Sequence, residues 1–304
     1  MVKINNIMYK VGFILNGKGR RKKQFYKELN HARKNLSNIE FNVVETTFEG
    51  HALSLASEYS KDGYTHIVAI GGDGTLHEAV NGAMKSYNPE VVMGLMPFGT
   101  ANDFTKTIKS PDSLADLFES ISKSKIVTLD VGKIEHRDGQ RFFINIADLG
   151  IGADVVKRVN KSNKMLGANL TFFKAIIQTF LRYKNQPINC VADDWEFSGK
   201  INSLVAANAK YFGSGLCIAP DADPTDGKFS VVVSGDITIQ DYLNNVKKIK
   251  RGQLIQHPEV SYKTAKVIKV QSDVDCGIEA DGEFIGYTPV TLSIDERKLK
   301  FLTV

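Results

Sequence analysis

The spacing of hydrophobic residues changes once along this chain of 304 residues, near residue 126. Before that point, short apolar runs alternate with segments in which apolar residues recur every three or four positions. These two patterns predict strands and helices, respectively. The predicted strands are Tyr9–Leu15, Phe41–Glu45, Ile67–Ile70 and Val91–Met96, and the predicted helices are Lys22–Leu36, His51–Ser60 and Ser113–Ile121. Strands that alternate with helices favour a parallel, doubly wound sheet.

Short β-rich runs dominate the rest of the chain, and turn dipeptides such as Asp226-Gly227 and Asp281-Gly282 separate several of them. The predicted strands are Ile126–Ile134, Arg141–Ala147, Ile188–Phe197, Leu204–Ala209, Phe229–Val233, Val267–Val270, Val290–Ile294 and Leu299–Val304. Two segments with helical spacing interrupt them, Leu166–Tyr183 and Ile239–Ile249. We therefore predict an α/β domain over residues 1–130 and a β-sandwich domain over 131–294, with a return of the chain to the first domain at 295–304 left open.

The composition is that of an ordinary globular protein, with 42% hydrophobic and 24% charged residues. No window approaches about 18 uncharged apolar residues, so we expect no transmembrane segment. The first residues contain no apolar signal region, and the three cysteines form no C-x-x-C pair. These features predict a cytoplasmic protein with reduced thiols.

Positive charge is unevenly distributed, although the net charge is only +5. Seven basic residues and no acidic one lie between Asp154 and Asp193, namely Lys157, Arg158, Lys161, Lys164, Lys174, Arg182 and Lys184. Such a block suits phosphates or an anionic membrane surface, and it equally suits a solvated face. No basic and aromatic motif for nucleic acid accompanies it, so no nucleic-acid partner is expected.

The strongest candidate for chemistry is the turn Gly71-Gly-Asp-Gly-Thr75, which follows a predicted strand. Its glycines let a ligand approach the backbone closely. A helix predicted to begin near Thr75 directs its N–H groups and the positive end of its dipole toward the turn. A polyphosphate fits this place, and Asp73 could hold the Mg²⁺ that such a ligand carries. Glycine-rich turns of this kind also occur without any nucleotide.

Two further polar turns follow predicted strands of the same domain. Thr100, Asn102 and Asp103 follow Val91–Met96, and the segment 16–20 follows the first strand. Ligands of open α/β sheets bind at the carboxyl ends of strands, so these residues are expected on one rim with Asp73. The alternative is that Thr100 or Asn102 only caps a helix.

The β-rich half contains two acidic segments. Asp281 and Glu283 flank Gly282, which suits a general base beside a magnesium ligand, although Asp-Gly is also a common hairpin turn. Asp221, Asp223 and Asp226 gather in a turn-rich loop, which suits either a hard cation or plain solvation.

Taken together, these segments resemble the diacylglycerol kinase catalytic family in its bacterial soluble branch, which is related to sphingosine and ceramide kinases. The motifs that carry the resemblance are Gly71-Gly-Asp-Gly-Thr75, Pro97-Phe-Gly-Thr-Ala-Asn-Asp-Phe104, Ala219-Pro-Asp-Ala222 with Asp226-Gly227, and Asp281-Gly-Glu283. The first motif alone is similar to phosphofructokinases and NAD kinases, and the others separate the lipid branch from these. The resemblance implies a doubly wound α/β domain for ATP, a β-sandwich domain for the lipid and the catalytic base, and an active site in the cleft between the two domains.

The resemblance also implies roles for single residues. Asp281 would be the general base, and Asp73, Asp103 and Glu283 would hold the catalytic Mg²⁺. The implied nucleotide-binding residues are Asn16, Gly17, Lys18, Gly19, Arg20, Thr46, Gly71, Gly72, Gly74, Thr75, Leu76, His77, Glu78, Thr100 and Asn102. A second, structural Mg²⁺ would be held by Asp223, Asp226 and Lys228. The turn 16–20 departs from the family's Asn-Pro-x-Ser-Gly, and Lys18 or Arg20 is the candidate replacement.

The sequence thus predicts an ATP- and Mg²⁺-dependent lipid kinase that phosphorylates a lipid hydroxyl, that of diacylglycerol or of a related lipid. We expect peripheral contact with a membrane, for which the apolar and basic helix Leu166–Tyr183 is the candidate, although such a stripe also fits a core helix. Two alternatives stay open: a kinase of a soluble substrate such as NAD, and a non-catalytic nucleotide-binding regulator. Whether the chain forms a homodimer is also open.

Overall fold

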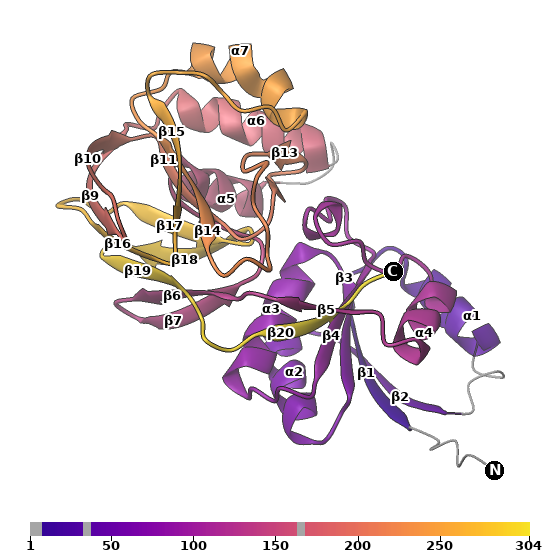
Figure 1. The fold of residues 1–304 in the computed structure, drawn as a ribbon. Coiled ribbons are helices and arrows are strands. Elements are labelled where there is room, and N and C mark those ends of the chain that lie inside the picture. Colours follow the sequence, from indigo (N-terminus) through magenta and orange to yellow (C-terminus); the bar gives the residue numbers. More distant parts are fainter. Residues whose placement is uncertain (1–7, 33–37, 163–167) are drawn as a thin grey trace. The chain divides into compact units, whose positions relative to one another are not determined.

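The structure, a computed structural model, describes residues 8–32, 38–162 and 168–304 (Figure 1). The chain divides into two compact units. The first contains the described residues up to Gly99 together with Ile108–Leu129 and Lys298–Val304. The second contains Thr100–Thr107 and Asp130–Arg297.

The first unit is built on a six-stranded sheet with the order β2-β1-β3-β4-β20-β5. Its strands are β1 (Tyr9–Leu15), β2 (Ile39–Glu45), β3 (His66–Gly71), β4 (Val92–Pro97), β5 (Ile126–Leu129) and β20 (Leu299–Leu302). The strands pair in parallel from β2 to β20, and only β5 is antiparallel to its neighbour. The carboxyl-terminal strand β20 therefore lies inside this sheet.

Helices cover both faces of the sheet, as a doubly wound fold requires. They are α1 (Lys22–Ala32), α2 (His51–Lys61), α3 (Asp73–Lys85) and α4 (Leu114–Ser122). Helices α1 and α4 place apolar residues such as Phe25 and Leu117 against Phe13 and Ile70 of the sheet. Helices α2 and α3 pack against each other and contact β3. The predicted doubly wound α/β fold of this part of the chain is confirmed.

The second unit contains two six-stranded antiparallel sheets, in the orders β10-β9-β16-β19-β6-β7 and β15-β14-β11-β8-β17-β18. The strands of the first sheet are β6 (Gly132–His136), β7 (Gly139–Phe143), β9 (Gln186–Ala192), β10 (Glu196–Ile201), β16 (Val267–Gln271) and β19 (Val290–Ile294). Those of the second are β8 (Ile146–Gly150), β11 (Ser203–Ala207), β14 (Phe229–Ser234), β15 (Val260–Ala265), β17 (Gly277–Ala280) and β18 (Glu283–Tyr287). Both sheets contribute to one apolar core, in which the rings of Phe143 and Phe229 stack at 5.5 Å. The predicted β-sandwich is confirmed.

Among the described residues of this unit, three helices accompany the sandwich: α5 (Ile151–Lys161), α6 (Ala168–Phe180) and α7 (Ile239–Lys250). Helix α5 follows β8 without a loop and packs on β8, β17 and β18, and α6 packs on α5. Two short pieces complete this unit, the hairpin of β12 (Tyr211–Phe212) with β13 (Leu216–Cys217) and a 3₁₀ turn, η2 (Phe104–Lys106).

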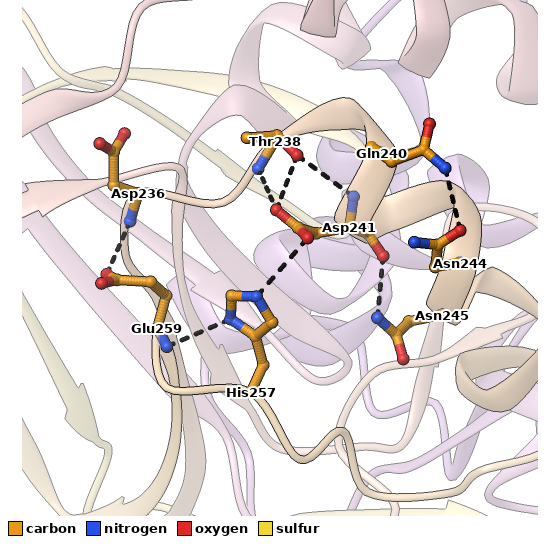
Figure 2. A network of polar contacts seen from close by, with 8 residues as sticks. All are labelled: Asp236, Thr238, Gln240, Asp241, Asn244, Asn245, His257 and Glu259. Atoms are coloured by element: carbon orange, nitrogen blue, oxygen red, sulfur yellow. Dashed lines mark hydrogen bonds and ion pairs between the residues drawn. The ribbon is translucent and has the colours of Figure 1, made fainter.

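Helix α7 is fixed at its start by a polar network, which Figure 2 shows. Thr238 and Asp241 form a capping box, and the hydrogen bonds from Thr238 hold the pKa of Asp241 below its ordinary value. Asp241 Oδ1 lies 3.6 Å from Nε2 of His257, whose Nδ1 accepts the N–H of Glu259 at 3.2 Å. The network thus ties α7 to the segment that leads into β15.

Several predicted strands prove to be pairs of strands. Residues 126–134 form β5 and β6, which belong to different units, and residues 141–147 run from β7 into β8. Residues 188–197 contain most of β9 and the start of β10, which are joined by a turn at Asp193 and Asp194. Helix α5 and strands β15, β17 and β18 were not predicted. In each of these merged segments, β-forming and apolar residues continue on both sides of the turn, and this hides the point where one strand ends and the next begins.

Two predicted helices extend beyond the residues that the structure describes. The end of the predicted helix Lys22–Leu36 and the start of Leu166–Tyr183 lie outside the described residues. No helix within the described ranges is both long and apolar enough to span a bilayer. The three cysteines, Cys190, Cys217 and Cys276, are all buried thiols.

Candidate active site

Four strands of the first unit end at one edge of its sheet. Strands β1 and β3 are neighbours, with β2 and β4 on their outer sides, so the direction of chain progression reverses between β1 and β3. The N–H of Asn16 donates to the carbonyl oxygen of Ile70 at 2.9 Å, and that of Thr46 donates to the carbonyl of Leu15 at 2.8 Å. The turns after β1, β2 and β3 therefore meet at the position where open α/β sheets bind their ligands.

The glycine turn leads directly into α3. The helix begins at Asp73 and not near Thr75, so the sequence prediction placed its start two residues too late. Gly72 is the N-cap residue and supplies no capping side chain. Asp73 thus lies in the first turn, where the helix dipole stabilises negative charge. The Nδ2 of Asn16 donates to Oγ1 of Thr75 at 3.3 Å, which connects the turn after β1 to this helix.

Hydrogen bonds within the first unit hold the turn at 16–20, which lacks the family's proline and serine. Asn16 Oδ1 accepts the N–H of Lys18 at 3.0 Å, and the N–H of Gly17 donates to Oγ1 of Thr46 at 3.2 Å. Lys18 and Arg20 are exposed. The guanidinium group of Arg21, a basic residue next to this turn, lies 4.0 Å from the ring centre of Phe98.

Three of the predicted nucleotide-binding side chains serve packing inside the first unit. Leu76 and His77 are buried, and His77 faces Asn81 one turn further along α3. The carboxylate of Glu78 accepts the N–H of Ala52 at the start of α2, at 3.1 Å. The buried side chains of Leu76 and His77 leave mainly their main chain for contact with a ligand, whereas Glu78 is half-buried.

Segment 100–107 follows β4 in sequence but clusters with the second unit. Asp103 is buried, and its carboxylate forms an ion pair with Lys106 and accepts the N–H of Ser214 at 2.8 Å. Asn102 adopts a left-handed conformation with φ of 47°, and its carbonyl accepts the hydroxyl of Thr105 at 2.8 Å. Nothing in the sequence around Asp103 marked Ser214 as a partner, because it lies 111 positions away.

Asp281 and Gly282 form the two-residue turn between β17 and β18, with φ of 51° and 87°. This confirms the hairpin turn, because positive φ at both central residues is typical of a type I′ turn. The carboxylate of Asp281 has a second task. Its Oδ1 accepts the N–H groups of Asn145 and Ile146 at 3.0 and 3.1 Å, and its Oδ2 accepts that of Ile144 at 3.2 Å. Three backbone donors thus fix the orientation of this carboxylate.

The acidic loop 219–228 is held by Asp130, a buried residue that the sequence did not single out. Asp130 Oδ2 accepts the N–H of Gly227 at 2.6 Å, and its own N–H donates to the carbonyl of Pro224 at 2.7 Å. Within the loop, Asp223 binds Thr225 and Asp226 accepts the N–H of Lys228 at 3.1 Å. These contacts hold the loop in its tight fold.

Two family models match this chain, one in each half. The diacylglycerol kinase catalytic domain matches residues 10–134, and the YegS C-terminal NAD kinase beta sandwich-like domain matches residues 145–303. The chain belongs to the family of diacylglycerol kinase-like lipid kinases. The resemblance inferred from the sequence motifs is therefore confirmed, as is the assignment of the chain as an enzyme of this class.

Curated relatives of this lipid kinase cover most of its length. A diacylglycerol kinase of Staphylococcus saprophyticus is 27% identical over 252 residues, which cover 83% of this chain and 81% of the relative. A diacylglycerol kinase of Staphylococcus aureus is 27% identical over 281 residues, with coverages of 91% and 87%. The relatives thus span both units.

Solved structures share the fold of this lipid kinase. A chain from Bacillus anthracis, provisionally described as a diacylglycerol kinase, aligns with a TM-score of 0.79 at 20% identity over 98% of both chains. A diacylglycerol kinase structure from the same bacterium aligns with a TM-score of 0.71 at 17% identity over 97% of both chains.

The metal ligands that the family implies for this lipid kinase are hard oxygen donors, which suit Mg²⁺. Asp73 belongs to the first unit, whereas Asp103 and Glu283 belong to the second. Among the described residues, no group of three or more His, Cys, Asp or Glu side chains is arranged to hold a metal.

Proposed function

We propose that this lipid kinase transfers the γ-phosphoryl group of ATP to the hydroxyl group of diacylglycerol and so forms phosphatidic acid. The observation that carries the proposal is the start of α3 at Asp73, directly after two glycines and at the switch point of a parallel sheet. Helix N-termini at such positions bind phosphates through backbone N–H groups and the helix dipole. The names of the curated relatives support diacylglycerol as the acceptor.

The first unit binds the nucleotide in this proposal. Main-chain N–H groups at Gly72 and Gly74 approach the phosphates, and the turn formed by Asn16, Gly17 and Thr46 borders the same edge of the sheet. Lys18 and Arg20 are exposed at this turn, and their positive charge replaces the phosphate contact that the family's proline and serine turn makes. Catalysis of phosphoryl transfer depends mainly on positioning the reacting groups and on stabilising the charge of the phosphates. The groups named here would do both.

The second unit supplies the groups that act on the acceptor. Asp281 orients the lipid hydroxyl and accepts its proton, since three backbone donors fix the direction of its carboxylate. Asp73, Asp103 and Glu283 hold Mg²⁺, either directly or through water. The bound cation would neutralise charge on the transferred phosphoryl group. Because Asp103 is already paired with Lys106, water-mediated contact suits it better than direct coordination.

Peripheral contact with a membrane completes the proposal, because the acceptor lipid resides there. Helix α6 and the residue that follows it expose Leu170, Phe173 and Leu181, while Ala175 and Thr179 of the same helix are buried. Basic residues Lys174 and Arg182 are exposed beside this apolar stripe. A helix with an exposed apolar stripe flanked by lysine and arginine suits the surface of an anionic bilayer.

The decisive experiment offers the purified chain radiolabelled ATP and Mg²⁺ with vesicles that contain diacylglycerol. Labelled phosphatidic acid is the expected product, and omission of Mg²⁺ should abolish it. A parallel reaction offers NAD in solution, because the family model of the second unit describes an NAD kinase-like sandwich. Labelled NADP without any lipid product would overturn the proposal and favour a soluble substrate. Absence of turnover on a panel of lipids and on NAD would favour a nucleotide-binding regulator.

A further inference from the structure

Two carboxyl groups lie buried opposite each other beneath α5, close to the hairpin that carries Asp281. Glu279 on β17 pairs in register with Asp148 on β8, and both residues are only 2% exposed. Within the described residues, neither carboxyl has an ion-pair partner. Burial of two acids without a cation costs free energy that apolar side chains would avoid. The arrangement therefore calls for a role other than packing.

Each carboxyl group accepts one hydrogen bond. That of Glu279 comes from the hairpin turn, and that of Asp148 comes from the neighbouring strand β11. Glu279 Oε2 accepts the N–H of Gly282 at 2.9 Å, inside the two-residue turn. Asp148 Oδ1 accepts the hydroxyl of Ser203 on the neighbouring strand β11 at 2.6 Å. The other oxygen of Asp148 borders Gly152 in the first turn of α5, where an added Cβ would lie 1.9 Å from it. The pair thus connects the hairpin, the sheet and α5.

The same turn is bound from its other side by Asp281. The N–H of Asp281 donates to the carbonyl of Ile146 at 2.9 Å, and its carboxylate accepts the N–H groups of residues 144–146. Both central residues of the turn have positive φ, so the backbone there has few alternative conformations that keep these bonds. Loss of the bond between Glu279 and Gly282 would leave the turn held on one side only.

We propose that Glu279 is a positioning residue of this lipid kinase: by binding the Gly282 amide within the turn, it fixes the directions in which Asp281 and Glu283 point. The role rests on the function proposed above, because it concerns the same reaction. Asp148 lies beside Glu279 on the neighbouring strand β8, and the hydroxyl group of Ser203 donates to Asp148.

The protonation of Glu279 suggests an informative substitution. Burial, and after it the neighbouring Asp148, raises the pKa of Glu279 well above its ordinary value. Glutamine matches glutamic acid in shape, and its amide oxygen can accept the same N–H from Gly282. Glu279→Gln should therefore preserve the position of the turn, whereas Glu279→Ala removes the acceptor.

The test compares these two variants with Val270→Ala, a cavity-forming change in the opposite sheet of the sandwich. We expect Glu279→Ala to lower kcat by about 10- to 100-fold with little change in the KM for ATP, since small displacements of reacting groups have effects of this size. Glu279→Gln should stay within about threefold of the wild type, a range that corresponds to minor repositioning. Val270→Ala should lower the Tm and leave kcat unchanged at a temperature where it is folded.

A second measurement does not depend on kinase activity. Amide hydrogen exchange followed by mass spectrometry should show faster exchange in residues 280–284 and 144–146 of Glu279→Ala, and wild-type exchange there in Glu279→Gln. Unchanged exchange in both segments of Glu279→Ala would overturn the positioning role. The positioning role would also be overturned if Glu279→Ala and Val270→Ala had the same kcat. A wild-type chain without lipid kinase activity would instead refute the proposed function. The exchange data would then still show whether the bond between Glu279 and Gly282 holds the turn in place.

Discussion

Gly17 and Thr46 are in direct contact where β1 and β2 end. The N–H of Gly17 donates to Oγ1 of Thr46 at 3.2 Å, and a Cβ added to Gly17 would lie 2.1 Å from the carbonyl oxygen of the same threonine. Only glycine fits at position 17 with this approach of the two turns. The contact also explains why Thr46 borders the edge that we assign to the nucleotide, whereas Thr47 bonds to His51.

Gly17→Ala should separate the two turns. Because the added methyl group meets backbone and not a flexible side chain, we expect a loss of about 1–3 kcal/mol in the free energy of unfolding, the usual cost of overpacking. Binding of ATP should weaken as well, and calorimetric titration can measure it. Lys18→Ala changes an exposed side chain of the same turn and is the control for stability. Equal Tm values for Gly17→Ala and the wild type would contradict this interpretation.

Asp73→Ala should abolish Mg²⁺-dependent phosphoryl transfer. The matched control is Asp116→Ala, since Asp116 also lies in the first turn of a helix of the same unit, α4. Both substitutions remove a carboxylate that stabilises a helix start, an effect of about 0.3–1 kcal/mol. Only Asp73→Ala should lose turnover. Unaltered MgATP binding together with unchanged turnover in Asp73→Ala would exclude a magnesium role.

Asp281→Asn should lower kcat by about 10²–10⁴-fold, the usual range for the loss of a general base. It should also lower stability, because an amide group retains one of the two oxygens that bind the N–H groups of residues 144–146. Asparagine tolerates the positive φ at this position. Turnover should therefore be measured well below the Tm of the variant.

Asp193 offers a control for Asp281. Its carboxylate likewise accepts two backbone N–H groups, those of Lys266 and Val267, in the other sheet of the sandwich. Asp193→Asn should lower the Tm without an effect on kcat. If Asp281→Asn and Asp193→Asn both lose kcat in proportion to their loss of stability, the role of Asp281 is structural and not catalytic.

Stability should fall as the pH rises from about 4 to 7. Burial raises the pKa of Asp148 from 3.8 to about 7, so the folded protein holds a proton that the unfolded chain releases near pH 4. The stability that this proton contributes is fully present below pH 4 and is lost as the pH approaches 7, with a slope of up to about 1.4 kcal/mol per pH unit. Burial also raises the pKa of Glu279 well above its ordinary value, so this carboxyl group adds to the same fall in stability.

Urea unfolding of Asp148→Asn at several pH values tests this dependence. The variant should show a flatter profile between pH 4 and 7, because asparagine does not titrate. Asp154→Asn changes an exposed acid of the neighbouring helix and should keep the wild-type profile. The remaining titratable groups near the pair are Asp281, Glu283, Tyr183 and Cys276. Identical slopes in the wild type and Asp148→Asn would show that Asp148 does not cause the pH dependence.

Leu181→Asp should weaken binding to vesicles that contain anionic lipid. Leu181 is 71% exposed beside Arg182, and a carboxylate there would repel an anionic surface. Val191→Asp, at a residue that is 56% exposed on β9, is the matched control and should bind vesicles as the wild type does. Co-sedimentation that does not distinguish the two variants, or that ignores anionic lipid, would exclude this helix as the membrane contact.

Local pattern determined the elements and the motif turns of this protein. A continuous apolar run around Phe13 marked the buried strand β1, and apolar residues at every third or fourth position around Phe25 marked α1. The Asp281-Gly282 hairpin followed from its two residues alone, since few other residues accept positive φ. The glycine turn before α3 was evident for the same reason, although the helix start at Asp73 was missed by two residues.

The tertiary structure decided which distant segments meet. Asp130 binds Gly227, Asp281 binds residues 144–146, and Glu279 faces Asp148, in each case across a long interval of sequence. Strand β20 entered the first sheet between β4 and β5. No local pattern records such partners, because a buried carboxylate or strand edge selects its neighbours by long-range burial and hydrogen bonding. The sequence therefore identified the chemical groups, and only the fold assigned them their contacts.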